Sequence, residues 1–220
     1  MNTIYRLLAV AGVLAVLYFM NTSVMDKKFD DWTAKSPDVH MNAARKSIDK
    51  NDLDRCIYEI EIAIADMVAI EEFSDDASKA MIEKAIRDLK DVEEDLKHDS
   101  VNVDVLNLVF AKGINTLAYT YLKISDDDLI HDHEVRAVGT LKIVIDHLYN
   151  SMGFLNKKNV EEERVIVNQI YEVIDSLKTT NMINHERIDL LFAEINHLIE
   201  EEESKLYEIH GNPDEDILNE

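Results

Sequence analysis

Cysteine, proline and glycine are all scarce in this 220-residue chain, which contains one Cys, two Pro and five Gly. Because Cys56 stands alone, no disulfide can form within the chain, and a zinc site built on several cysteines is excluded. Five glycines argue against a Gly-rich phosphate-binding loop, and none of the motifs of such loops occurs. Few Gly and Pro residues also mean few turns, so we expect long helices.

Positive charge is scarce as well. Lys and Arg number 23 against 45 Asp and Glu, which gives a formal net charge of -22. Such a charge repels phosphate backbones, so we expect no nucleic acid partner, whereas a basic protein or a cation would be attracted. The simpler interpretation is an acidic surface that only keeps the chain soluble. Hydrophobic residues make up 46 % of the chain, which is enough to build a packed core.

Motifs for catalysis are also missing. No serine stands in the Gly context of a nucleophile elbow, and Cys56 lies among apolar residues, where a structural role is expected. No stretch alternates Asp or Asn around a central Gly as a calcium loop does. We therefore expect no enzyme, no catalytic residue and no cofactor.

An apolar segment, Ile4–Met20, stands at the N-terminus, and it is uncharged from Leu7 onward. As a helix it would span roughly 25 Å, close to the thickness of a hydrocarbon core. A cleaved signal peptide is the alternative, but the small-residue pattern that cleavage requires, Ala9–Ala11, lies inside the run. We therefore predict an uncleaved transmembrane signal anchor over residues 1–23.

The orientation of this anchor is decided by its flanking charges. Arg6 and the amino terminus precede the run, while Lys27 and Lys28 follow it, so the two sides nearly balance. A short N-terminal tail with a positive residue ahead of the run is the usual arrangement for export. We expect a single-pass membrane protein whose C-terminal part is extracytoplasmic, either periplasmic or at the cell surface.

The rest of the chain shows the periodicity of an all-α protein. A juxtamembrane linker (24–36) is followed by a helical domain (37–209) and an acidic tail (210–220). Pro37 is placed to start the first helix, Ser125 and Asp128 resemble a capping box that starts the fifth, and Gly153 is placed to end the fifth. We expect about seven helices after the anchor, at about 36–50, 53–73, 74–98, 103–124, 125–152, 159–178 and 184–209.

The expected helices carry apolar stripes at helical spacing, and no run alternates with the period of a strand. Short loops make consecutive helices antiparallel neighbours, which predicts a bundle or an array of helical hairpins. Gly113 lies within the stripe of the fourth helix, where it would allow a close helix crossing. The stripe of that helix comprises Leu106, Phe110, Gly113, Ile114, Leu117, Tyr121 and Ile124.

Small and apolar residues of the first two helices resemble a tetratricopeptide hairpin over about 25 residues. They are Ala44, Asn51, Leu53, Cys56, Ile60, Ala63 and Ile64. His40 replaces the usual aromatic residue, Asn51 replaces the turn glycine, and no good second copy follows. The resemblance therefore implies only a helical hairpin.

Three histidines, His131, His133 and His147, lie within one short segment of the sequence. On one continuous helix, His131 and His133 would lie about 160° apart, and His147 would lie about 21 Å along the axis from His133. We therefore expect surface or boundary histidines and no metal site. If a metal is bound, His131, His133 and Glu134 are the first candidates. Glu134 falls near the centre of the stripe, so it is either solvated or lines a polar pocket that faces a cation or a basic group.

Glu194 and His197 have the Glu-x-x-His spacing of ferritin-like metal sites, and Asp95–His98 and Asp128–His131 are aspartate versions. His197 and His98 fall off their apolar stripes, which disfavours such a site. The acidic run Glu200–Ser204 is interpreted as a solvated helix end.

These features together predict a membrane-anchored, extracytoplasmic helical binding or scaffold module, or an accessory subunit, that interacts with a protein partner. If the acidic surface takes part in that interaction, the partner is expected to be basic. The alternative is an ion-binding or sensor domain that uses acidic and histidine side chains. A ferritin-like metalloenzyme is a weaker alternative.

Overall fold

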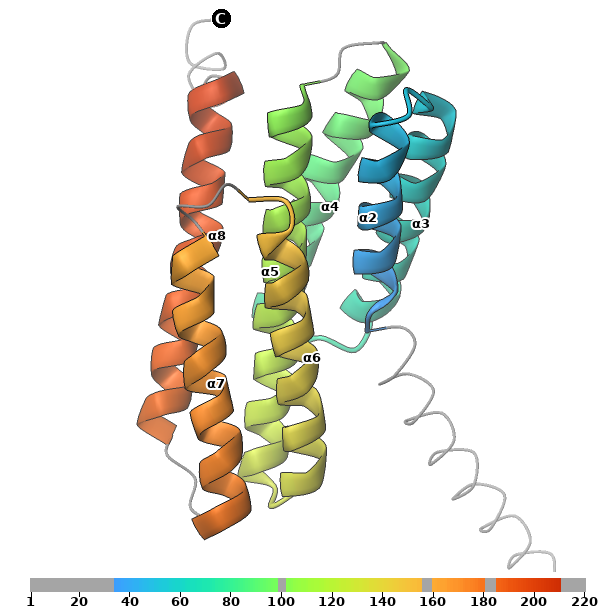
Figure 1. Ribbon diagram of the computed structural model, residues 1–220. Coiled ribbons are helices and arrows are strands. Elements are labelled where there is room, and N and C mark those ends of the chain that lie inside the picture. Colours follow the sequence, from blue (N-terminus) through green and yellow to red (C-terminus); the bar gives the residue numbers. More distant parts are fainter. Residues whose placement is uncertain (1–33, 99–101, 156–159, 181–184, 211–220) are drawn as a thin grey trace, which may run out of the picture. The chain divides into compact units, whose positions relative to one another are not determined.

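Short polar side chains begin three of the helices in the computed structural model, which describes residues 34–98, 102–155, 160–180 and 185–210 (Figure 1). Asp52 accepts a hydrogen bond from the Arg55 backbone N–H, and Asp75 accepts one from that of Ser78. Asn102 accepts two such bonds at the start of the longest helix. Each cap satisfies backbone donors that have no partner within the helix, which fixes where the helix begins.

The described part of the chain contains seven helices and no strand, so the all-α prediction is confirmed. Their bounds lie within a few residues of those expected, except around residue 130. The helices are α2 (Ser36–Ile48), α3 (Leu53–Glu71), α4 (Asp76–Lys97), α5 (Val103–Ile130), α6 (Glu134–Met152), α7 (Val160–Thr180) and α8 (His185–His210).

The predicted boundary at Ser125 is wrong. Ser125 is buried inside α5, and its hydroxyl donates a hydrogen bond of 3.2 Å to the Ala137 carbonyl of α6. The helix continues to Ile130, and the chain turns at Asp132, whose φ is 61°. An aspartate adopts this left-handed conformation more readily than most residues. The resemblance to a capping box arose from polar residues that serve packing between helices.

Helix α5 packs against α4 and, more lightly, α2 on one side, and against α6 and α8 on another (Figure 1). Helices α2, α3 and α4 pack on one another in sequence, as do α6, α7 and α8. Because α5 is shared by both groups, its side chains are buried around most of its circumference. Several polar residues in the middle of α5, Lys112, Asn115, Thr116 and Thr120 among them, are therefore buried.

Gly113 is the position where α2 comes close to α5. A Cβ at this glycine would lie 3.2 Å from Cε of the buried Met41 side chain. Such a contact would be tighter than ordinary van der Waals packing, so the glycine leaves room for the Met41 side chain of α2, while the close helix crossing stays a prediction.

The chain divides into two units, residues 1–34 and residues 35–220. The predicted anchor (1–23), most of the linker (24–36) and the tail beyond His210 lie outside the described residues. Among the helices that are described, none is long and apolar enough to cross a membrane.

Candidate functional site

Four helices each contribute one buried polar side chain to a single cluster. Asn115 comes from α5, Ser151 from α6, Glu163 from α7 and Glu202 from α8, and none of them is more than 2 % exposed. We call these four residues the carboxyl cluster. The Asn115 amide donates hydrogen bonds of 3.1 Å to Glu163 and 2.9 Å to Glu202, and the Ser151 hydroxyl donates one of 2.7 Å to Glu163.

Three oxygen atoms of the carboxyl cluster have no hydrogen-bond partner among the described residues. They are Oδ1 of Asn115, Oε2 of Glu163 and Oε2 of Glu202. A buried polar atom without a partner costs free energy, and a buried ionised carboxylate costs more. The cluster thus contains more acceptors than donors as long as both carboxyls are ionised.

The environment changes the proton affinity of both acids. Burial raises the pKa of Glu163 to about 7 from its usual value of 4.5, although the bonds from Ser151 and Asn115 oppose the shift. Burial, and then the neighbouring Glu163, raise the pKa of Glu202 well above its usual value. At neutral pH the pair therefore holds at least one proton for a large share of the time.

A buried lysine lies one turn away on the same central helix. Lys112 is 3 % exposed, and its ammonium group lies 2.8 Å from Oδ2 of Asp88 on α4 and 3.6 Å from Oε2 of Glu203 on α8. Glu203 also binds Lys84 and accepts a 2.8 Å hydrogen bond from Tyr207. Burial opposes it, but these bonds lower the pKa of Glu203. The ion pairs join α4, α5 and α8.

His147 was predicted to lie at the surface or boundary of its helix, and this prediction is wrong. The ring is fully buried, and its Nδ1 lies 2.9 Å from Oδ2 of Asp38 on α2, which is 1 % exposed. Asn150 donates a 2.7 Å hydrogen bond to the same oxygen, and the Tyr121 ring lies 5.4 Å from the imidazole between centroids. The reason is that α2 covers the edge of the stripe on which His147 lies.

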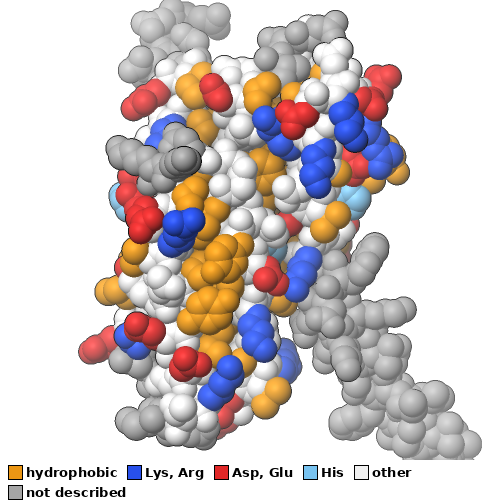
Figure 2. Space-filling model, in the orientation of Figure 1, with side chains coloured by type: hydrophobic (Ala, Val, Ile, Leu, Met, Phe, Trp, Pro, Cys, Tyr) orange, Lys and Arg blue, Asp and Glu red, His pale blue; other side chains and the backbone are white. Residues whose placement is uncertain are grey.

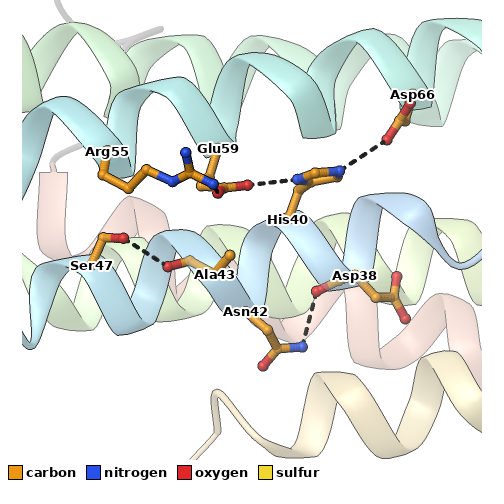
Figure 3. A network of polar contacts seen from close by, with 8 residues as sticks. All are labelled: Asp38, His40, Asn42, Ala43, Ser47, Arg55, Glu59 and Asp66. Atoms are coloured by element: carbon orange, nitrogen blue, oxygen red, sulfur yellow. Dashed lines mark hydrogen bonds and ion pairs between the residues drawn. The ribbon is translucent and has the colours of Figure 1, made fainter.

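A second histidine joins α2 to α3 (Figure 3). Nδ1 of His40 lies 2.6 Å from Oε2 of the buried Glu59, and its Nε2 lies 4.0 Å from Oδ2 of Asp66. Arg55 binds the other oxygen of Glu59. The contact between His40 and Glu59 thus joins the two helices of the hairpin. A tetratricopeptide hairpin would have an aromatic residue at the position of His40.

The candidate metal residues His131, His133 and Glu134 lie at the turn between α5 and α6. Because the chain is not helical here, the angle expected between the two histidines is wrong: their rings stack with centroids 6.3 Å apart. His131 lies 3.5 Å from Oδ1 of Asp127, and His133 lies 3.6 Å from Oδ1 of Asp128. Glu134 is partly exposed in the first turn of α6. Within the described ranges, no group of three His, Cys, Asp or Glu residues is arranged to hold a metal ion.

The other candidate histidines are exposed. The side chains of His197 and His98 are 66 % and 72 % exposed, so neither Glu194–His197 nor Asp95–His98 directs its histidine into the core. The run Glu200–Ser204, expected to be solvated, contains Glu202, which is buried. Helical spacing is a usable signal for both acids of the carboxyl cluster, because Glu163 and Glu202 each fall three or four residues from buried apolar positions of their helices.

Cys56 is fully buried on α3, and burial, with a smaller contribution from Asp52, raises the pKa of its thiol to about 11. The thiolate is the reactive form of cysteine. We therefore expect maleimide to label native protein at pH 7.5 roughly a hundredfold more slowly than protein unfolded in urea. Rates followed by mass spectrometry would test this, and equal rates would contradict the burial.

A pocket of 480 Å³ opens between the N-terminal end of α5 and the C-terminal ends of α6 and α8. Its lining mixes polar and apolar side chains, and Lys205 is its only cationic member among the described residues. The lining comprises Asp104, Asn107, Leu108, Phe154, Leu155, Lys205, Glu208 and Ile209.

No family model, no curated protein and no solved structure matches this chain. A functional proposal therefore rests on its own buried groups and exposed surfaces.

Proposed function

We propose that this chain is a helical binding or scaffold module, or an accessory subunit, that engages a protein partner at an extracytoplasmic membrane surface. The observation that supports it is a set of large hydrophobic side chains exposed on α6 and α7. Val135 and Tyr149 of α6 are 89 % and 51 % exposed, and Val165 and Tyr171 of α7 are 49 % and 46 % exposed. Figure 2 shows hydrophobic side chains running lengthwise over α6 and the side of α7 next to it.

Tyrosine and exposed aliphatic side chains suit a protein interface. A tyrosine buries a large apolar area at little cost in conformational entropy, and contiguous apolar surface on a soluble domain marks interaction sites. The net charge of -22 favours a basic partner through long-range attraction. The apolar segment Ile4–Met20 supports the membrane location, because it would hold the helices close to the bilayer.

Affinity capture of the full-length chain from mild detergent tests this role. The double substitution Tyr149→Ser and Tyr171→Ser should abolish recovery of a partner that the unchanged chain retains, since exposed aromatic residues carry much of the binding energy at interfaces. Tyr58→Ser on α3, a tyrosine of similar exposure, is the matched control and should leave recovery unchanged. Equal recovery with the double variant would contradict a role for this surface.

A second candidate function is an ion-binding or sensor domain, and the stacked His131 and His133 rings favour it. The two exposed imidazoles alone could hold a transition metal weakly, with water as the further ligands. Native mass spectrometry with added zinc distinguishes this function, because stoichiometric uptake lost in His131→Ala would support it. A ferritin-like metalloenzyme is the weaker alternative and would require iron to co-purify with the chain.

A further inference from the structure

The carboxyl cluster joins all four helices of the α5–α8 group, yet nothing in the proposed binding role uses it. Glu163 and Glu202 both accept hydrogen bonds from the one amide nitrogen of Asn115. This geometry holds two carboxyl groups close together at a place in the core where both side chains are at most 2 % exposed. Two ionised carboxylates so placed repel each other, and one proton shared between them removes most of that repulsion.

No cationic side chain contacts either carboxyl among the described residues. The ammonium group of Lys112 is bound by Asp88 at 2.8 Å, and that of Lys205 lies 3.3 Å from Glu201. Both lysines act on the cluster only through the longer-range field. The three unpartnered oxygens therefore lack donors, and a proton on one carboxyl supplies one.

We propose that Glu163 and Glu202 form a proton-binding site that holds α7 and α8 firmly against α5 and α6 only while at least one of the two carboxyls is protonated. Loss of that proton leaves two negative charges on neighbouring helices with too few donors to satisfy them. The α7–α8 pair then loosens from the rest of the helices as pH rises above neutrality and the pair loses its last proton. This inference is independent of the partner-binding role, and it would hold if the α6–α7 surface bound nothing.

The charged groups around the site set the sign and range of the effect. Glu162 on α7 opposes ionisation of Glu163, whereas Lys205 on α8 favours it. Lys112 on α5 favours ionisation of Glu202, although Asp88 of α4 and Glu203 of α8 offset its charge. From α6 the group that contacts the carboxyls is the neutral Ser151 hydroxyl. Burial outweighs these charges, so both acids keep a raised pKa.

The direction of the pH dependence follows from the folded-state pKa of about 7 for Glu163 against 4.5 for an unperturbed glutamate. Between these values the native state holds a proton that the unfolded state releases. The stabilisation is fully present below the lower value and is lost as pH rises through the upper one. One proton of difference raises the equilibrium constant for unfolding about tenfold per pH unit within this window.

Urea unfolding of the full chain in detergent, measured from pH 5 to pH 8.5, tests the site. Glu163→Gln and Glu202→Gln keep the size of the side chain, remove the titration and replace one acceptor oxygen with an amide donor. Each variant should lose the part of the pH slope that its own carboxyl contributes, and each should be the more stable protein at pH 8.5. Glu161→Gln and Glu200→Gln, exposed acids near them on α7 and α8, are matched controls and should keep that slope.

Hydrogen exchange corrected for intrinsic rates gives a second measurement. At pH 8.5 the amides of α7 and α8 should exchange faster in the unchanged chain than in Glu202→Gln, while α3 and α4 should not differ. Equal pH slopes in the unchanged chain and both Gln variants would overturn the proposal. So would restoration of stability at pH 8.5 by millimolar calcium, magnesium or manganese, because the site would then hold a metal ion in place of the proton.

Discussion

Replacing Lys112 with alanine should destabilise the protein by about 3–5 kcal/mol, the cost typical of removing one partner from a buried ion pair. Lys112 is 3 % exposed, and its charge is shared by Asp88 and Glu203. Without it, the Asp88 and Glu203 carboxylates lose the cation that lies between them, and the space of the lysine stem is left empty. Chemical denaturation followed by circular dichroism would measure the loss.

Lys84→Ala is the matched control, because Lys84 binds the same Glu203 but is 41 % exposed. Exposed ion pairs contribute at most about 1 kcal/mol, so this variant should stay close to the unchanged protein. If the two variants lost similar amounts of stability, the prediction that the buried Lys112 contributes more to the free energy of unfolding than the exposed Lys84 would be contradicted. Lys112→Met, which keeps the stem, separates the loss of charge from the loss of packing.

Most helix positions could be predicted because they depend on local chemistry. The N-cap residues Asp52, Asp75 and Asn102 accept hydrogen bonds from backbone N–H groups two or three residues further along the chain. The start of each of these helices therefore depends on a short stretch of sequence. The end of α5 could not be predicted in this way. Ser125 and Asp128 have the composition of a helix start, but they are buried against α6, a contact that depends on the tertiary structure.

The buried polar groups were harder to predict for a related reason. A helical periodicity shows where a residue lies on its own helix, but it does not show which helices cover that face. Glu202 lies within an acidic run that looks solvated, and only its register with Ile199 and Leu206 places it inside. Lys112 and Asn115 are buried because α5 serves two groups of helices, and no local pattern reveals that α5 is shared.

The burial of His147 likewise depends on a helix that is distant in the sequence, and its substitution is expected to have the second large effect on stability. His147→Ala should destabilise the protein by about 3 kcal/mol or more, because the substitution leaves a cavity and removes the main partner of the buried Asp38 carboxylate. The two residues are 109 positions apart in the chain and belong to different helices. Their contact therefore holds α6 and α2 together. His133→Ala is the control, since that ring is 54 % exposed and should cost under about 0.5 kcal/mol.

A double-mutant cycle separates the contact between His147 and Asp38 from the packing of the ring. Asp38→Ala alone should also be costly, because it leaves His147 and Asn150 facing an empty space in the core. If the two side chains act as a unit, the double variant should lose less stability than the single losses added together, by about 1–3 kcal/mol. Additive losses would mean that the two residues contribute independently, and the link between α2 and α6 would then rest on apolar packing around Tyr121 and not on the histidine–aspartate contact.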